Sequence, residues 1–382
     1  MSTPTLFQPI KVGNNALQHR VVLAPLTRMK ATEKEHVPTV RLMKTYYSQR
    51  SSLAGSLLIS EATLIAPQAG GYDSVPGIWN QAQIDAWKEI TDAVHANGSF
   101  IYLQLWALGR GGEYRVREED GYETVGPSAI PITPSKEVQS LKDFIVPEEK
   151  KYATPRALSI PEIREYVRWY AEAAKNAVEG AGFDGVEFHN ANGYLPDQFL
   201  QDVSNQRTDV YGGSVEGRSR FGLEVVDALV KAVGKEKVGV RLSPWKAFQS
   251  MRMADPIPQF SHFVQTLADA HPNLSYLHVI EPDTPTLSND FLRNIWAPRP
   301  YISTGRHNRE TAIARSDKSG DLVAFGRWYI SNPDLPTRLI KNIPLTPYSS
   351  DTFYVPVKYE STGKGYIDYP FADEKVSETL SS

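Results

Sequence analysis

The sequence contains no cysteine among its 382 residues. Disulfides, thiolate nucleophiles and cysteine-ligated metal or iron–sulfur centres are therefore excluded. Charge of one sign is not in excess either, because 41 Lys and Arg residues stand against 44 Asp and Glu residues, for a formal net charge of −3. We therefore expect neither nucleic acid nor an anionic membrane surface as a partner.

Long hydrophobic runs are also missing. No apolar stretch approaches the roughly 18 residues that a membrane-spanning helix needs. The first residues, MSTPTLFQPIKVG, lack the basic and apolar regions of a secretory signal. The eight histidines show no H-E-x-x-H or other metal-ligand spacing, so no metal is expected. These absences favour a cytoplasmic globular protein that acts on a small molecule.

What is present is an alternation of short β-rich runs with amphipathic helical stretches. Several of the runs are apolar without clean alternation, which is typical of parallel strands covered by helices. We predict strands near 19–26, 56–62, 100–106, 185–189, 238–244, 276–281, 301–305 and 322–326. Among the helices, Ser159–Glu179 begins with a possible capping box of Ser159 and Glu162, and Val215–Val233 is another.

Eight strands with intervening helices indicate an α/β protein, either a closed (β/α)8 barrel or an open doubly wound sheet. No G-x-G-x-x-G or Walker A sequence follows any strand, which favours the TIM barrel. We expect one domain over residues 1–382. It would carry an N-terminal β-hairpin in 1–18 that closes the barrel bottom, a long excursion or lid in 108–158 after the third strand, and a C-terminal tail in 371–382.

Polar residues gather where the fourth predicted strand ends. His189, Asn192 and Tyr194 lie there, and catalytic groups of such barrels sit at the carboxyl ends of strands. His and Asn can both donate hydrogen bonds to one carbonyl oxygen, and a Tyr hydroxyl can deliver a proton. The alternative is an ordinary Asn-Gly turn beside a structural histidine.

A phosphate site is indicated after the last two predicted strands. Gly305 and Gly326-Arg327 stand at those strand ends. Barrels often hold phosphate in these loops, because glycine lets backbone N–H groups approach an anion and arginine pairs with it bidentately. The alternative is a turn with a surface arginine.

The segment Gly185–Phe221 resembles the most specific signature of the Old Yellow Enzyme family. It reads His-x-x-Asn-Gly-Tyr-Leu, then Gln-Phe-Leu, then Ser-Asn-x-Arg-Thr-Asp-x-Tyr-Gly-Gly-Ser-x-Glu-x-Arg-x-Arg-Phe. The resemblance covers nearly the whole chain and continues, in family order, at Ala24–Arg28, Pro67–Tyr72, Gln104–Trp106, Arg241–Pro244, Gly326–Arg327, Ser331–Leu335 and Gly365–Pro370.

The resemblance implies a (β/α)8 barrel with one non-covalent FMN at its mouth and NADPH as hydride donor, with NADH as the alternative. Thr27 would contact flavin O4, Pro25 and Ala62 would line the ring, and Gln104 would meet its pyrimidine edge. Arg241 would sit by N1 and O2, where a cation stabilises the reduced flavin. The pocket walls would be aromatic: Tyr72, Trp106, Phe248, Phe291 and Tyr354. By sequence alone, aromatics in apolar runs are more often core residues.

The implied reaction is ping-pong reduction of the C=C bond of an α,β-unsaturated aldehyde or ketone. His189 and Asn192 would hold the substrate carbonyl, flavin N5 would supply hydride, and Tyr194 would protonate the α-carbon. Alternatives are a relative acting on nitro compounds or an alkaloid-pathway aldehyde, and a catalytically silent flavin-binding barrel.

Two departures from the family pattern affect substrate range. Ala62 stands where many relatives have Gly, and the stretch from Ile280 to Tyr301 is short, which would leave the pocket more open. The sequence does not identify the physiological substrate, its stereochemistry or the coenzyme preference. Both monomers and homodimers occur in the family.

Overall fold

The computed structural model describes residues 3–133 and 153–372. The predicted excursion 108–158 is thus described at its two ends, while 134–152 lies outside the described residues. Its described ends contain α3 (Tyr114–Glu119) and a two-stranded parallel pair of β7 (Val125–Gly126) with β8 (Arg156–Ala157). The predicted tail 371–382 lies outside them from residue 373 onward.

A closed barrel of eight parallel strands forms the centre of the molecule. Each strand pairs with the next one along the chain, and the last pairs with the first through Val323 opposite Val21. The prediction of a (β/α)8 barrel is therefore confirmed. The strands are β3 (Val21–Leu23), β4 (Leu57–Ile59), β6 (Phe100–Trp106), β9 (Gly185–His189), β10 (Val238–Leu242), β11 (Tyr276–Ile280), β12 (Tyr301–Thr304) and β13 (Leu322–Phe325). The short β5 (Thr63–Leu64) adds to β6 above β4.

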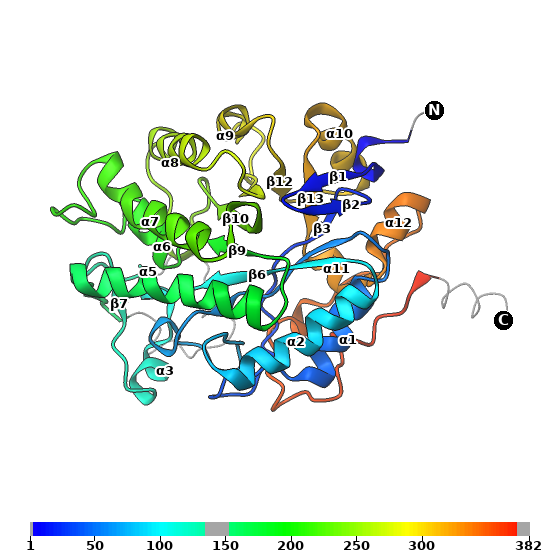
Figure 1. Cartoon of the computed structure of the whole chain (residues 1–382), viewed down its shortest axis with the longest axis horizontal. Coiled ribbons are helices and arrows are strands. Elements are labelled where there is room, and N and C mark those ends of the chain that lie inside the picture. The colour runs from blue at the N-terminus through cyan, green and yellow to red at the C-terminus, as the bar shows by residue number, and fades with distance from the viewer. Residues whose placement is uncertain (1–2, 134–152, 373–382) are drawn as a thin grey trace.

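Helices surround the barrel, and α5 packs along α7 as α1 does along α2 (Figure 1). Ser159 and Glu162 form the predicted capping box, but α5 ends at Lys175 and a π-helical turn, Asn176–Gly180, replaces its expected last turn. The larger helices are α1 (Val40–Arg50), α2 (Gln81–Ala96), α5 (Ile160–Lys175), α7 (Val215–Val233), α8 (Ile257–Ala270) and α10 (Arg309–Ser319). The shorter ones are α6 (Leu195–Leu200), α9 (Asp290–Trp296), α11 (Arg327–Ser331) and α12 (Leu335–Lys341).

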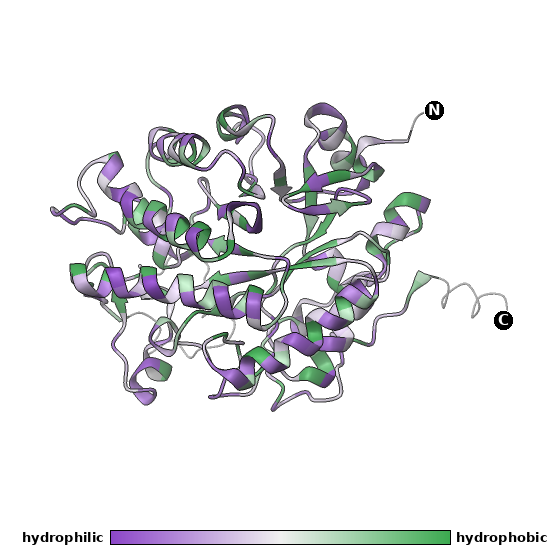
Figure 2. Cartoon of the chain, in the orientation of Figure 1, coloured by the Kyte–Doolittle hydropathy of each residue, from purple (hydrophilic) through white to green (hydrophobic). Residues whose placement is uncertain are grey.

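The apolar side chains separate into three layers that follow from strand alternation, because successive residues of a strand point to opposite faces. One layer lies between strands and helices and includes Val186, Phe188 and Val240. A second fills the barrel with residues such as Tyr102 and Tyr276. A third stands above the strands around Trp106. Figure 2 shows the barrel strands mainly in the hydrophobic colour and the outer helices striped with both colours.

The N-terminal hairpin closes one end of the barrel. β1 (Ile10–Val12) pairs antiparallel with β2 (Asn15–Leu17) across Gly13, which has a φ of 55°. A Cβ on Gly13 would lie 2.0 Å from the carbonyl oxygen of Glu236 and 2.5 Å from Ser275 Oγ. Both residues precede barrel strands, so the hairpin lies at the amino ends of the strands. The opposite end is left for a site.

Candidate active site

A cavity of about 300 Å³ opens at the carboxyl ends of the strands. It brings together the three predicted catalytic residues with most of the predicted flavin and pocket residues. Its lining is Pro25, Leu26, Thr27, Ala62, Gln104, Trp106, His189, Asn192, Tyr194, Arg241, Lys246, Phe248 and Tyr354. A larger and more open hollow of about 510 Å³ lies by α1 and α2, but it contains none of the predicted residues.

The backbone of the loop after β9 is fixed by hydrogen bonds to side chains of neighbouring segments. Asn192 and Gly193 have φ angles of 58° and 74°, a conformation that costs a non-glycine residue free energy. Asn192 N donates to Ser243 Oγ at 2.8 Å, and its carbonyl accepts from Gln249 Nε2 at 2.9 Å. Gly193 N donates to Asp197 Oδ2 at 2.8 Å. These bonds hold the left-handed turn that lets both Asn192 and Tyr194 line the cavity.

His189 and Tyr194 meet in the cavity wall. Their ring centroids lie 5.0 Å apart at 79°, and Tyr194 packs edge-on against Trp106 at 4.9 Å. Burial raises the pKa of Tyr194 well above its usual range, so the hydroxyl keeps its proton at neutral pH. Burial, reinforced by the Arg241 charge, lowers the pKa of His189 well below 6.5, so the imidazole is neutral. The pair offers a neutral hydrogen-bond donor beside a protonated phenol.

Buried polar atoms of the lining are left for a ligand. Within the described part of the chain, His189 Nδ1, Arg241 Nε and Trp106 Nε1 are buried and have no hydrogen-bond partner. Such atoms are uncommon in folded proteins because each costs a desolvation penalty. Short apolar residues, Leu26 and Ala62 among them, share the wall with these donors. An apolar wall with a few convergent donors fits a flat heteroaromatic ring with polar edges, as in FMN.

Tyr354 reaches the cavity from a distant part of the sequence. Arg28, which is 1% exposed, donates from its guanidinium to the carbonyl oxygens of Thr352, Phe353 and Gly365 at 3.2, 3.1 and 2.8 Å. The same guanidinium lies 4.9 Å from the ring centroid of Tyr366. Arg28 therefore fastens residues 352–366 over the end of β3 and sets Tyr354 in the wall.

The three predicted phosphate residues do not line the cavity. Gly305 follows β12, Gly326 is the N-cap of α11, and Arg327 is the first residue of that helix and exposed. A Cβ on Gly326 would lie 3.0 Å from Leu26, which does line the cavity. Gly326 therefore lies beside the cavity, and Gly305 and Arg327 stand with it at the ends of β12 and β13 without being part of the lining.

Two predicted pocket residues lie elsewhere. Tyr72 is fully buried behind Trp106, with ring centroids 5.8 Å apart, and its hydroxyl donates to the Gly111 carbonyl at 2.7 Å. Phe291 belongs to α9 and packs edge-on against Trp245 at 6.2 Å. The short segment after β11 turns into α9 at Asp290, which directs Phe291 toward Trp245 and the outer core instead of the cavity.

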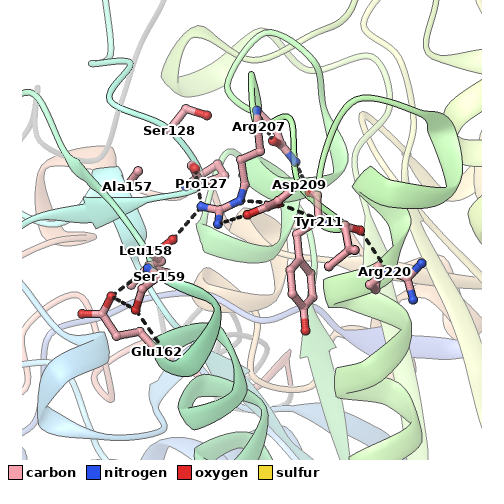
Figure 3. A network of polar contacts seen from close by, with 12 residues as sticks. Pro127, Ser128, Ala157, Leu158, Ser159, Glu162, Arg207, Asp209, Tyr211 and Arg220 are labelled. Carbon is pink, nitrogen blue, oxygen red and sulfur yellow. Dashed lines mark hydrogen bonds and ion pairs between the residues drawn. The ribbon is translucent and has the colours of Figure 1, made fainter.

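The second half of the signature segment braces the fold instead of lining the cavity (Figure 3). Arg207 donates to the carbonyl oxygens of Pro127 and Leu158 at 2.9 and 2.6 Å and pairs with Asp209. Asp209 in turn accepts from Tyr211 N at 3.0 Å. Arg207 thus ties the loop before α7 to both described ends of the 108–158 excursion.

Several residues at the site escaped sequence reasoning. Leu26 and Lys246 line the cavity, and Lys246 Nζ pairs with Asp283 Oδ2 at 2.6 Å. Asp197 holds the Gly193 turn, and Glu187 lies beneath the cavity. Glu187 carried a usable signal, because it stands two residues before His189 on a strand and therefore shares its face. Lys246 stands in a loop and Asp197 in the short helix α6, where too few residues repeat for periodicity to indicate direction.

The described residues include no helix with the length and apolar character needed to cross a membrane. They also contain no group of three or more His, Asp or Glu side chains able to hold a metal ion.

The chain is similar to known flavin oxidoreductases in sequence and in fold. The model of the NADH:flavin oxidoreductase / NADH oxidase family matches residues 5–346. A probable inactive reductase, easA, of Epichloe festucae var. lolii is 46% identical over 396 residues, which cover 99% of this chain and 98% of that protein. The chanoclavine-I aldehyde reductase fgaOx3 of Penicillium roqueforti (strain FM164) is 47% identical, covering 97% of each chain. The crystal structure of Old Yellow Enzyme from Pichia sp. AKU4542 matches with a TM-score of 0.86 at 38% identity, covering 97% of this chain and 94% of that one.

Proposed function

Since the chain belongs to the NADH:flavin oxidoreductase / NADH oxidase family, as a member of the Old Yellow Enzyme type, we propose that it is an FMN-dependent ene reductase. Its substrates would be α,β-unsaturated aldehydes and ketones, and NADPH would be the reductant. The observation that carries this proposal is the meeting of His189, Asn192 and Tyr194 in one cavity at the strand ends.

FMN, when bound, supplies the chemistry that takes hydride from the nicotinamide and passes it to the C=C bond. We assign its ring to contacts with Pro25, Thr27, Ala62, Gln104 and Arg241, all of which line the cavity. Gly305, Gly326 and Arg327 would bind its phosphate, since they follow β12 and β13 and Gly326 adjoins Leu26 of the cavity lining.

The protein groups would act on the substrate in two ways. Neutral His189 and the Asn192 amide would donate hydrogen bonds to the carbonyl oxygen and stabilise the negative charge that develops there. Tyr194 Oη would give its proton to the α-carbon, a role suited to a phenol that burial keeps protonated. Trp106, Phe248 and Tyr354 would exclude water from the reacting atoms.

The relatives suggest a second candidate within the same chemistry. The 47% identity to a chanoclavine-I aldehyde reductase over 97% of both chains favours an alkaloid-type unsaturated aldehyde as the substrate. The similarity to a probable inactive reductase supports a third reading, a barrel that binds flavin without turnover. The intact trio at the cavity argues for activity.

A spectroscopic experiment separates these possibilities. The purified protein is scanned in the visible range, reduced anaerobically with NADPH and then given 2-cyclohexenone. A yellow protein that bleaches with NADPH and recolours with the enone supports the proposal. A protein that bleaches but does not respond to the enone directs the search to alkaloid aldehydes or nitro compounds. A colourless protein that cannot be reconstituted with FMN contradicts the proposal.

A further inference from the structure

A chain of buried polar side chains lies directly beneath the cavity. Gln104 Nε2 donates to Glu187 Oε1 at 2.7 Å, and His278 Nδ1 lies 2.7 Å from Glu187 Oε2. His278 Nε2 in turn contacts Thr304 Oγ1. Gln104 is 1% exposed, and Glu187 and His278 are fully buried. No residue of the trio assigned to the reaction belongs to this chain.

The strand register explains how Glu187 comes to lie there. Glu187 is opposite Gln104 on β6 and precedes His189 by two residues, so it points to the same barrel interior one step lower. Arg241 on β10 is opposite His189 on one side and His278 on the other. Glu187 therefore touches one predicted flavin contact, Gln104, and lies close below another, Arg241.

The hydrogen-bond chemistry fixes the orientation of the Gln104 amide. An ionised carboxylate only accepts hydrogen bonds, so the NH2 end of Gln104 must face Glu187 and the carbonyl end is left for the cavity. Burial acts to raise the pKa of Glu187, but His278, Arg241 and Gln104 outweigh it and hold the pKa below its ordinary value. Burial lowers the pKa of His278, so the neutral ring donates from Nδ1 to the carboxylate.

The charges point in the same direction. Arg241 presents a guanidinium to the cavity, and Glu187 is the anion whose charge acts on it inside the barrel. A cation beside the ring favours a reduced, anionic ligand, and a nearby anion weakens that preference. Glu187 thus influences two of the predicted flavin contacts. It orients the Gln104 amide through a hydrogen bond, and its negative charge partly offsets the positive charge of Arg241.

We propose that Glu187 is a positioning residue for the flavin: it turns the Gln104 carbonyl toward the ring edge, offsets the Arg241 charge, and so sets the reduction potential of the bound flavin. This inference rests on the proposed function, because it presumes FMN in the cavity. Glu187 itself touches neither the flavin nor the substrate.

The test uses two substitutions that separate the two effects. Glu187→Gln removes the charge but keeps an oxygen for Gln104, and Glu187→Asp keeps the charge but withdraws the carboxylate from Gln104 by one methylene. Asp197→Asn is the matched control, since it changes another buried carboxylate near the cavity that bonds to Gly193 and Gln201 instead. For each protein the apoprotein affinity for oxidised FMN and the flavin midpoint potential are measured.

Glu187→Gln is expected to raise the ratio of reduced to oxidised FMN affinity on the order of tenfold, which is about 30 mV for a two-electron couple. Glu187→Asp is expected to keep the wild-type potential and to bind oxidised FMN several-fold more weakly. Asp197→Asn is expected to leave the potential unchanged.

A folded, FMN-loaded Glu187→Gln protein with the wild-type potential would overturn the inference and leave the proposed function intact. If Glu187→Gln cannot hold FMN, Glu187→Asp decides, because an unchanged FMN affinity there overturns the positioning of Gln104. A wild-type protein that does not bind FMN at all contradicts the proposed function, and this inference falls with it.

Discussion

The two sides of the cavity are built in different ways. Gln104, His189 and Arg241 stand on barrel strands, where register with neighbouring strands sets their height and direction. Tyr194 and Tyr354 lie outside the barrel strands, and each depends on hydrogen bonds from other side chains. For Tyr194 these come from distant Ser243 and neighbouring Asp197, and for Tyr354 from distant Arg28. Strand-borne groups are therefore placed by the fold itself, while loop-borne groups need partners of their own.

The two kinds of support determine how the site responds to substitution. A substitution on the strand side removes a chemical group but leaves its neighbours in place, because the sheet hydrogen bonds remain. A substitution in a loop clamp leaves every chemical group present but misplaces it, and a displacement of about 1 Å at a reacting centre costs on the order of 10²-fold. Substitutions on the two sides are therefore expected to differ both in size of effect and in the property that they impair.

Tyr194→Phe keeps the loop and its ring packing but removes the proton donor. We expect the reoxidation of reduced enzyme by 2-cyclohexenone to slow by roughly 10²–10⁴-fold, the usual contribution of a general acid. Reduction by NADPH should be unaffected. Stopped-flow absorbance resolves the two half-reactions, and an unchanged reoxidation rate would remove the proton-donor role.

His189→Ala tests the strand side. Loss of one donor to a developing oxyanion typically costs about 10²–10³-fold in rate. We expect a loss of this size in kcat/KM for the enone with little change in melting temperature, since the Nδ1 atom of this histidine has no partner within the described structure. Steady-state kinetics and thermal melting together check this, and a large loss of stability would contradict it.

Asp197 holds the Gly193 turn, and its titration makes the stability of the protein depend on pH. Burial raises the pKa of Asp197 from 3.8 to about 7. The folded protein thus holds this proton more tightly than the unfolded chain, so the contribution to stability is fully present below about pH 4 and is lost as the pH rises through 7. Asp197→Asn does not titrate.

We therefore expect the free energy of unfolding of Asp197→Asn to rise relative to that of the wild type between pH 4 and pH 8, by at most about 4 kcal/mol. Denaturant melts of both proteins at several pH values measure the difference. Parallel curves for the two proteins would show that the buried carboxyl does not titrate in this window.

Lys246→Met changes a partly exposed residue of the cavity lining and should have the smallest effect. The Lys246–Asp283 pair is partly exposed, and such pairs contribute about 0–1 kcal/mol. We expect an unchanged melting temperature and unchanged kinetics with neutral cyclohexenone, but a higher KM for an unsaturated aldehyde that carries a carboxylate. Equal effects on both substrates would show that the Lys246 ammonium does not contribute to binding a charged substrate.

The contrast between the two sides also explains what the sequence could predict. The eight strands were placed correctly, because apolar runs between amphipathic helices leave few alternatives. The candidates His189, Asn192 and Tyr194 then follow from the end of the fourth strand, because barrel strands bring their carboxyl ends together. Arg241 came from the family resemblance. The family resemblance, not periodicity, led to Thr27, Tyr354 and the other loop residues.

The two predicted pocket residues that the cavity lining does not include share one physical feature. Phe291 and Tyr72 are aromatic residues outside the barrel strands, and a local turn decides whether such a ring enters the cavity or packs behind it. The start of α9 turns Phe291 toward Trp245, and the bond to Gly111 holds Tyr72 behind Trp106. Nothing in the neighbouring sequence encodes these directions. The roles assigned to the other site residues stay predictions until they are tested by substitution.

The clamp formed by Arg28 has a consequence for the order in which the protein is made. The last barrel strand ends at Phe325, whereas Arg28 holds a segment that extends to Gly365 and carries Tyr354. During synthesis on the ribosome, all eight strands can emerge and pair while the segment that bears Tyr354 is still inside the exit tunnel. The barrel of the nascent chain is therefore complete before its cavity is. Tight binding of a ligand becomes possible only after the segment that carries Tyr354 has left the ribosome.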